Sequence, residues 1–357
     1  MVSYSNGSTA FALKQQKDIE ESYEMLEKYG LHVKSPDFYA AETLNEALSL
    51  LAEIEGSKII AGGMDMMDLM RNTICQPSAL ISIRNIPQLS HIMNVVVGEE
   101  RGLDIGSMTK VNTIAESKEI IKKYPLLAQA ALHIGSPQIR NMISAAGNLC
   151  QQTHCWYYRR SPSTGLTFDC IRNGKGNTCH AKDGENENHA IFCSGKCHSA
   201  NHSDLAVAFT ALDAKLKVSS DAGKRWISMD KFYTNLGNSL KQDEIITGIM
   251  IPEAEENTRQ QYIKVASRQS IDIAIASVAS SIVMDGERVK SARIVLGGVA
   301  DKPYRALKAE EMLKGERITE NIAEKAAKEV ASDAEPLEGN EYKVNLLTTI
   351  LKRAILA

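Results

Sequence analysis

The sequence predicts an α+β fold, in which strands and helices mix without regular alternation. The first observation is length: 357 residues, 43% of them apolar and 24% charged, are typical of a globular chain with two or three domains. The second is the pattern, since short apolar runs ended by Gly or Pro occur between stripes of helical spacing. The third is that six of the seven cysteines lie in one polar segment, which predicts a functional loop.

Charge and hydropathy limit the classes of partner. The formal net charge is −3, so we expect no nucleic-acid partner. The N-terminus has no basic and apolar regions of a signal peptide, and the longest uncharged apolar run, 273–284, is too short to cross a bilayer. We therefore expect no membrane association and a cytoplasmic, reducing location.

The first elements follow from local signals. Residues 1–33 are polar with a helical pattern around 19–29, which predicts an N-terminal extension. An extended segment at 38–40 precedes Thr43 and Glu46, whose spacing predicts a capping box that begins a helix over 44–53. A short strand over 58–61 then runs into Gly62 and Gly63, which open a helix that continues to 71.

The remaining elements are predicted from periodicity. Apolar runs predict strands over 79–82, 102–106, 216–219, 226–227, 244–251, 261–267, 273–284 and 291–299. Helical spacing predicts helices over 114–132 with a break at Pro125, 205–212, 229–235, 303–335 and 342–356. Segment 135–148 is dense in small and amide residues without a helical stripe, which predicts either backbone packed against a rigid group or a glycine-rich turn.

The strand, glycine and helix sequence at 58–71 carries a possible chemistry. Glycines allow close approach of the backbone to a phosphate, and the first amides of a helix favour an anion. The motif matches neither the dinucleotide fingerprint GxGxxG nor a P-loop. By itself it is also compatible with a plain tight turn.

The polar segment 147–204 contains the cysteine cluster. Cys155, Cys170, Cys179 and Cys197 are spaced C-x14-C-x8-C-x17-C. Three hypotheses fit this spacing: an iron–sulfur cluster held by four thiolates, a structural zinc site, or free or disulfide-bonded cysteines. In a zinc site, His180, His189 or His198 could serve as further ligands beside the cysteines. Only Cys193 and Cys197 approach the paired spacing usual for zinc, and a reducing location disfavours disulfides.

With these motifs located, the chain from about residue 35 to its end resembles the FAD-binding subunit of molybdenum hydroxylases, the medium-subunit family of xanthine and carbon monoxide dehydrogenases. Ile60-Ala61-Gly62-Gly63-Met64-Asp65 resembles the A-G-G-T-D pyrophosphate loop of that family, and 136–149 resembles its second flavin loop. Ser203-Asp204 followed by Leu212-Asp213-Ala214 matches S-D-L…L-D-A. Lys264, twelve residues after Pro252, matches a flavin-contacting lysine.

The resemblance implies a two-subdomain FAD-binding fold of the PCMH or vanillyl-alcohol-oxidase type, followed by a C-terminal α+β domain. The implied parts are an extension (1–33), FAD-binding subdomains (34–88 and 89–222, the second with a cysteine-rich loop at 150–200) and a C-terminal domain (223–357). The implied FAD-binding residues are Ile59, Ile60, Ala61, Gly62, Gly63, Met64, Asp65, Met66, Ile134, Ser144, Gly147, Asn148, Ser203, Asp204, Ile246 and Lys264.

Two positions depart from the family pattern. Met64 replaces the usual Thr, which removes a hydroxyl from the phosphate loop, and Ala146 replaces the first glycine of G-G-N. Since backbone amides make most phosphate contacts, both loops are still expected to bind.

The cysteine loop resembles an insertion in the flavin subunits of 4-hydroxybenzoyl-CoA reductase and a bacterial aldehyde oxidoreductase. That insertion holds a [4Fe–4S] cluster, which implies Cys155, Cys170, Cys179 and Cys197 as its ligands. The start at Cys155, the Cys179-His180 pair and a cysteine seven residues before Asp204 match, and the last of these favours Cys197 over Cys193.

The implied function is electron transfer as the flavoprotein subunit of an oxidoreductase. FAD and the cluster would relay electrons between a molybdopterin large subunit with a [2Fe–2S] small subunit and an external carrier such as ferredoxin or NAD. The alternatives are a zinc-stabilised binding module, whose glycine loops are only turns, and a stand-alone flavin oxidoreductase, for which the sequence offers no second nucleotide motif. The substrate and the direction of electron flow are not encoded in this chain.

Overall fold

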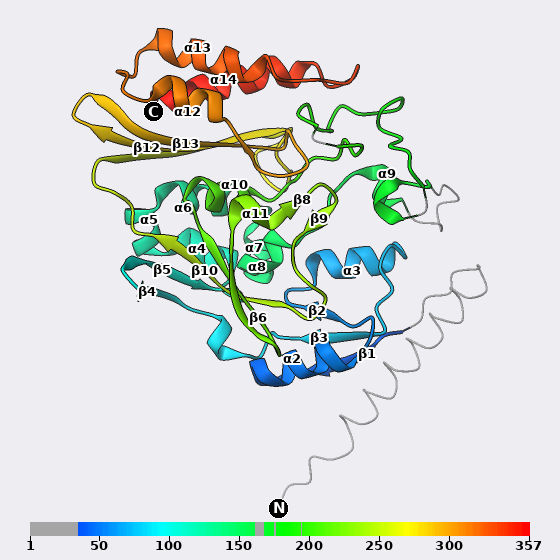
Figure 1. The fold of residues 1–357 in the computed structure, drawn as a ribbon. Helices are drawn as coiled ribbons and strands as arrows, with labels where there is room; N and C mark the ends of the chain where they lie inside the picture. The colour runs from blue at the N-terminus through cyan, green and yellow to red at the C-terminus, as the bar shows by residue number, and fades with distance from the viewer. Residues whose placement is uncertain (1–34, 161–167, 175, 194) are drawn as a thin grey trace, which may run out of the picture.

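The structure is a computed structural model that describes residues 35–160, 168–174, 176–193 and 195–357. The predicted extension over 1–33 lies outside the described residues. Within them, helices combine with parallel and antiparallel sheets, so the α+β prediction is confirmed (Figure 1). No helix in the described ranges is long and apolar enough to cross a membrane.

The N-terminal unit is a parallel three-stranded sheet. Its strands lie in the order β1 (Asp37–Ala40), β3 (Ala79–Ser82) and β2 (Lys58–Ile60), and its helices are α2 (Leu44–Glu53) and α3 (Met64–Arg71). The predicted N-cap is present, because the Thr43 hydroxyl accepts from the Glu46 amide at 3.2 Å, but the Glu46 carboxylate accepts from the amide of Glu42, one residue before the position expected for a capping box, at 2.9 Å. The short 3₁₀ helix η1 (Pro87–Leu89) leads out of the unit.

A five-stranded antiparallel sheet forms the middle of the molecule. Its order is β4 (Ile92–Val97), β5 (Glu100–Gly106), β10 (Ile245–Pro252), β6 (Lys215–Ser220) and β7 (Gly223–Ser228). Between β5 and β6 the chain forms α4 (Val111–Glu116), α5 (Lys118–Lys123), α6 (Pro125–Leu132), α7 (Pro137–Met142), α8 (Ala145–Leu149), α9 (Trp156–Arg159), η3 (Ile171–Asn173) and α10 (Asp204–Ala211). The largest apolar core lies between this sheet and helices α4, α6 and α10.

The C-terminal unit is a second antiparallel sheet covered by helices. Its strands are β11 (Thr258–Val265), β12 (Ala276–Asp285), β13 (Arg288–Gly297) and β14 (Tyr304–Arg305). Helices α12 (Leu307–Leu313), α13 (Glu320–Ala331) and α14 (Tyr342–Leu356) form the outer layer, and α6 and α10 pack on the opposite side (Figure 1). A helix α11 (Met229–Phe232) and a hairpin of β8 (Tyr233–Thr234) and β9 (Gly237–Asn238) connect β7 to β10 of the five-stranded sheet.

Several predicted elements differ from the structure. The helix predicted over 114–132 has the predicted break at Pro125, which occupies the first turn of α6, and a second break at Ser117, which caps α5, so it is three helices. Segment 135–148 is helical in α7 and α8, each capped by a serine hydroxyl, at Ser136 and Ser144. Strand β4 was not predicted; it is an edge strand with a largely exposed face.

Two further helices are shorter than predicted. The helix predicted over 229–235 ends at Phe232, where the chain enters the β8–β9 hairpin. The helix predicted over 303–335 is interrupted by Gly315, which has a φ of +78° and separates α12 from α13. The domain boundary at 222 and 223 stays a prediction; the sheet that contains β6 also contains β7 and β10.

Candidate functional site: a cavity beside a cysteine-rich loop

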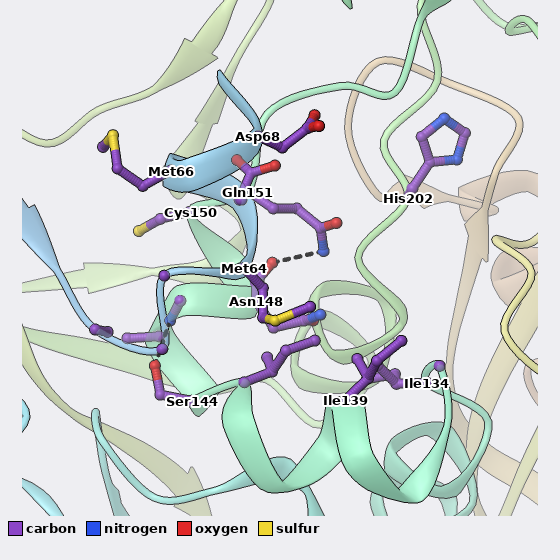
Figure 2. Close-up of a pocket in the computed structure, with 18 of the residues that line it drawn as sticks. Met64, Met66, Asp68, Ile134, Ile139, Ser144, Asn148, Cys150, Gln151 and His202 are labelled. Atoms are coloured by element: carbon purple, nitrogen blue, oxygen red, sulfur yellow. Dashed lines mark hydrogen bonds between the residues drawn. The ribbon is translucent and has the colours of Figure 1, made fainter. Parts of the chain in front are cut away.

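A cavity of about 580 Å³ lies where the N-terminal unit, the middle helices and the C-terminal sheet meet (Figure 2). This volume is in the range of pockets that hold small molecules and cofactors. One wall is the β2–α3 turn. Gly63 caps α3 with a φ of +77°, a left-handed conformation that favours glycine, and the first amides of α3 follow it.

Gly62 is required by a close approach of two chain segments. A Cβ at this position would lie 2.1 Å from the carbonyl oxygen of Met142, the last residue of α7. The first loop therefore packs directly on the second one, and the N-terminus of α8 follows beside it. At that terminus the Ser144 hydroxyl accepts from the Gly147 amide at 3.2 Å. The first amides of α8 already donate to the carbonyls of Thr109 and Ser107, so the N-terminus suited to an anionic group is that of α3.

The opposite wall carries a buried ion pair. The Lys264 ammonium donates to Asp204 at 2.8 Å and to the His133 carbonyl at 3.0 Å, and both charged side chains are only 5% exposed. Asp204 also accepts a 2.5 Å hydrogen bond from the hydroxyl of Tyr262. Burial, and then the charge of Asp204, raise the pKa of Tyr262 well above its ordinary value. The lysine charge is therefore balanced within the wall of the cavity.

Nearly all predicted FAD-binding residues line this one cavity. These are Ile59, Ile60, Ala61, Gly62, Gly63, Met64, Asp65, Met66, Ile134, Ser144, Gly147, Asn148, Asp204, Ile246 and Lys264. Ser203 is the exception among the predicted set. It lies behind the wall, where its hydroxyl donates to the Asn148 side chain at 2.7 Å and caps α10. Figure 2 shows Ile134, Ser144 and Asn148 around one side of the cavity.

Sequence reasoning missed residues at the edge between the cavity and the cysteine-rich loop. Gln151, His154, Arg159 and His202 line the cavity there. Burial lowers the pKa of His154 to about 4 and that of His202 well below its ordinary value, so both imidazoles are neutral. No motif marked these positions, because their proximity arises only when 150–159 folds back on α3.

The cavity fits a large, partly anionic cofactor such as FAD. The Oγ of Ser107 and the Nδ1 of His202 are buried on its lining residues without a hydrogen-bond partner in the described part of the chain. Buried polar atoms normally have partners, so these two indicate donors and acceptors available to a bound group. Together with the N-terminus of α3, they match the needs of phosphates and a polar ring system.

The predicted cluster ligands gather in the cysteine-rich loop. The His198 amide donates to the sulfur of Cys179 at 3.5 Å, and the Arg172 amide donates to that of Cys170 at the same distance. The Arg172 guanidinium donates to Cys197 at 3.3 Å. Such hydrogen bonds to sulfur stabilise thiolates and tune sulfur-held clusters.

Cys197 interacts electrostatically with the other three predicted ligands and also with Cys193. It shares a hydrogen bond with Cys179 that lowers its own pKa and raises that of Cys179. Its charge also raises the pKa values of Cys155 and Cys170, behind the larger effect of burial. Cys193 is instead directed to His198, with its sulfur 2.9 Å from Nδ1.

The loop does not form a ready-made metal centre in the described residues. No group of three or more His, Cys, Asp or Glu side chains there has the geometry of a metal site. All seven cysteines are free. His189 lies 3.2 Å from the sulfur of Cys155, and burial lowers the pKa of His189 to about 4. The donor set matches a thiolate-held cluster in composition.

Comparison with known proteins identifies the family to which the chain belongs. Residues 31–254 match the FAD binding domain in molybdopterin dehydrogenase, and residues 261–357 match the CO dehydrogenase flavoprotein C-terminal domain. The aldehyde oxidoreductase FAD-binding subunit of Escherichia coli strain K12 is 31% identical over 289 residues, which cover 79% of this chain and 86% of that protein. The carbon monoxide dehydrogenase medium chain of Hydrogenophaga pseudoflava is 25% identical, with 89% and 95% covered.

Solved structures agree on the fold. Carbon monoxide dehydrogenase from Hydrogenophaga pseudoflava superposes with a TM-score of 0.71 at 24% identity, covering 90% of this chain and 96% of that one. Quinoline 2-oxidoreductase from Pseudomonas putida 86 has a TM-score of 0.71 at 23% identity, with 91% and 96% covered. The chain therefore belongs to the FAD-binding medium subunits of the molybdenum hydroxylase family, together with those of carbon monoxide and xanthine dehydrogenases, and is a flavoprotein subunit of an oxidoreductase.

Proposed function

We propose that this chain is an electron-transfer subunit that holds one FAD in the cavity and one [4Fe–4S] cluster in the cysteine-rich loop. The single observation that supports it best is the convergence of fifteen predicted FAD-binding residues, from four distant stretches of sequence, on one cavity. FAD, when bound, supplies the exchange between one-electron and two-electron transfer.

The chain's own residues would divide the binding. Gly62, Gly63 and the first amides of α3 would hold the pyrophosphate, since they offer donors at a helix N-terminus. The second loop, through Ser144 to Asn148, would contact the flavin and its ribityl chain. The Lys264 ammonium would lie at the flavin ring, held in position by its hydrogen bonds to the Asp204 carboxylate and the His133 carbonyl.

Cys155, Cys170, Cys179 and Cys197 are the proposed cluster ligands. The support is the interaction of Cys197 with each of the other three and the backbone donors directed at their sulfurs. Cys193 is the weaker candidate because its sulfur is directed to His198. A zinc site formed by the same loop is the competing hypothesis, since His180, His189 and His198 lie in the same segment.

The proposed partners are a molybdopterin large subunit and a [2Fe–2S] small subunit, with ferredoxin or NAD as the outside carrier, in the cytoplasm. Family membership and the names of relatives, which include medium chains of carbon monoxide and glyceraldehyde dehydrogenases, support the two partner subunits; the carrier follows only from the family resemblance and the location only from the sequence. The substrate would bind on another chain.

The test is an ultraviolet–visible spectrum with iron, zinc and acid-released flavin analysis on anaerobically purified protein. We expect flavin near one per chain and about four irons. Zinc without iron would overturn the cluster and leave the flavin proposal standing. A colourless protein without flavin would overturn both.

A further inference from the structure

One arginine of the cysteine-rich loop forms ion pairs with two carboxylates of α3, the helix that follows the first glycine loop. Arg159, the last residue of α9, places one guanidinium nitrogen 2.5 Å from Asp65 and the other 2.6 Å from Asp68. The two carboxylates are three residues apart on α3 and therefore share one face of that helix. We call these three residues the clamp.

Further hydrogen bonds fix the position of Arg159 between the loop and α3. The Nε of Arg159 donates to the carbonyl of Thr153 at 2.7 Å, and one terminal nitrogen donates to the carbonyl of Gln152 at 3.0 Å. Asp65 uses its second oxygen to accept the Gln152 amide at 2.9 Å. The Arg159 side chain is only 10% exposed, whereas Asp65 is 23% and Asp68 45% exposed, so solvent screens the bond to Asp65 less than the bond to Asp68.

The clamp also touches both proposed cofactor sites. Asp65, Asp68 and Arg159 line the cavity, and Asp65 lies in the first turn of α3, next to the glycines. On the other side, the segment that carries Arg159 begins with Cys155, a proposed cluster ligand. The sequence separation of Arg159 from the two carboxylates exceeds ninety residues, so only the fold brings them together.

We propose that the clamp couples the two sites, so that FAD binding at the glycine loop orders the cysteine-rich loop. The coupling rests on the proposed FAD site, but it does not require the cluster. Arg159 is a positioning residue in this scheme: it pairs with two carboxylates beside the expected phosphates, offsets one of their two negative charges, and transmits the position of α3 to the loop. By thermodynamic reciprocity, an ordered loop also raises the affinity for FAD.

The test is amide hydrogen exchange of the full-length chain, freed of FAD and then saturated with it. In the wild type, we expect FAD to slow exchange by about tenfold in residues 62–71 and also in 150–160 and 176–193, a coupling of ordinary size. Arg159→Gln should keep the protection at 62–71 and lose it in the cysteine-rich loop. Arg159→Lys keeps the positive charge but not the planar guanidinium that reaches both carboxylates. It should therefore retain more FAD affinity than Arg159→Gln and still lose the loop protection.

The control is Arg317→Gln, which removes a surface ion pair with Glu287 whose side chains are 65% and 73% exposed. It should leave both protection patterns unchanged. Equal loop protection by FAD in the wild type and Arg159→Gln, or no loop protection in the wild type, would overturn the clamp. Iron is measured on the same samples: its absence from the wild type would defeat the cluster alone, and failure of the wild type to bind FAD would defeat both proposals.

Discussion

The Lys264–Asp204 pair shows how a single side chain depends on its neighbours. Both side chains are almost fully buried, and Tyr262 holds the second oxygen of the carboxylate. Removing one partner of a buried pair leaves the other charge unpaired, which commonly costs about 3–5 kcal/mol. A role in flavin chemistry must therefore be separated from this structural effect.

We predict that Lys264→Met leaves FAD bound but lowers its reduction potential, because the reduced flavin loses a positive charge and faces an unbalanced Asp204. The melting temperature should also fall. Combining it with Asp204→Asn should recover most of the stability, since both charges are then absent. Spectroelectrochemical titration measures the potential, and an unchanged value in the single variant would argue against the role of Lys264.

Lys343 is a second buried cation, at the start of α14. Its side chain is fully buried, and its ammonium donates to the carbonyls of His189 and Gly298 at 2.9 Å each. Burial lowers its pKa from 10.5 to about 7. Because the folded pKa is the lower one, the unfolded chain binds more protons between pH 7 and 10.5, and this residue makes stability rise with pH in that window.

We predict that Lys343→Met changes the pH dependence of unfolding in a defined direction. The variant lacks the penalty of burying a charge, which is greatest below about pH 7 in the wild type. Its melting temperature relative to wild type should therefore be highest near pH 6 and fall towards pH 9. Calorimetry at three pH values measures the difference, and a difference that grows with pH would contradict the assignment.

At the scale of elements, the α3 and α8 N-termini owe their position to a backbone contact. Gly62 allows the first loop to reach the C-terminal carbonyl of α7, and no side chain fits between them. The neighbouring atom belongs to backbone, so it cannot move aside as a flexible side chain would. Two short segments separated by eighty residues thereby form one binding edge.

We predict that Gly62→Ala weakens FAD binding by about 5- to 150-fold, because relieving the clash costs about 1–3 kcal/mol and moves the two loops apart. Fluorescence titration of the flavin-free chain with FAD measures it. Gly237→Ala is the matched control, since a Cβ there meets no atom within 4 Å and its φ is not positive. Equal affinities in the two variants would show that the close approach is unimportant.

At the scale of the whole molecule, the cysteine-rich loop joins parts of the chain that are distant in sequence. Arg159 connects it to α3, and the Asn340 side chain donates to the carbonyls of His189 and Ala190 from the segment before α14. The Gly339 amide and the Asn186 side chain make a further bond at 2.9 Å. The loop therefore lies between the N-terminal and C-terminal units, beside the cavity.

We predict that Cys179→Ser loses iron and its brown colour while keeping close to one FAD per chain at saturating FAD, because the cavity does not include Cys179. Cys75→Ser, a change at a half-buried thiol outside the loop, should keep the full iron content. Cys193→Ser should keep it as well. Retention of four irons in Cys179→Ser would remove that residue from the ligand set.

The sequence by itself determined the α+β class, most strands, the capped helix α2 and the glycine loop before α3, because these depend on short-range patterns. It also located the candidate FAD residues, through motifs in a specific order. It predicted the break between α5 and α6 at Pro125, but it did not separate α4 from α5 or find α7 and α8, since serine caps override a weak periodicity.

Only the tertiary structure decided which distant groups meet. Lys264 and its partner Asp204 are 60 positions apart in the sequence, and Lys343 and its acceptor His189 are 154 apart. Arg159 and Asp65 in the clamp are 94 apart. Such contacts depend on how the units pack, because the sequence around a residue does not indicate a partner that is distant in the chain. For the same reason the sequence did not predict the residues at the edge of the cavity, Gln151, His154, Arg159 and His202.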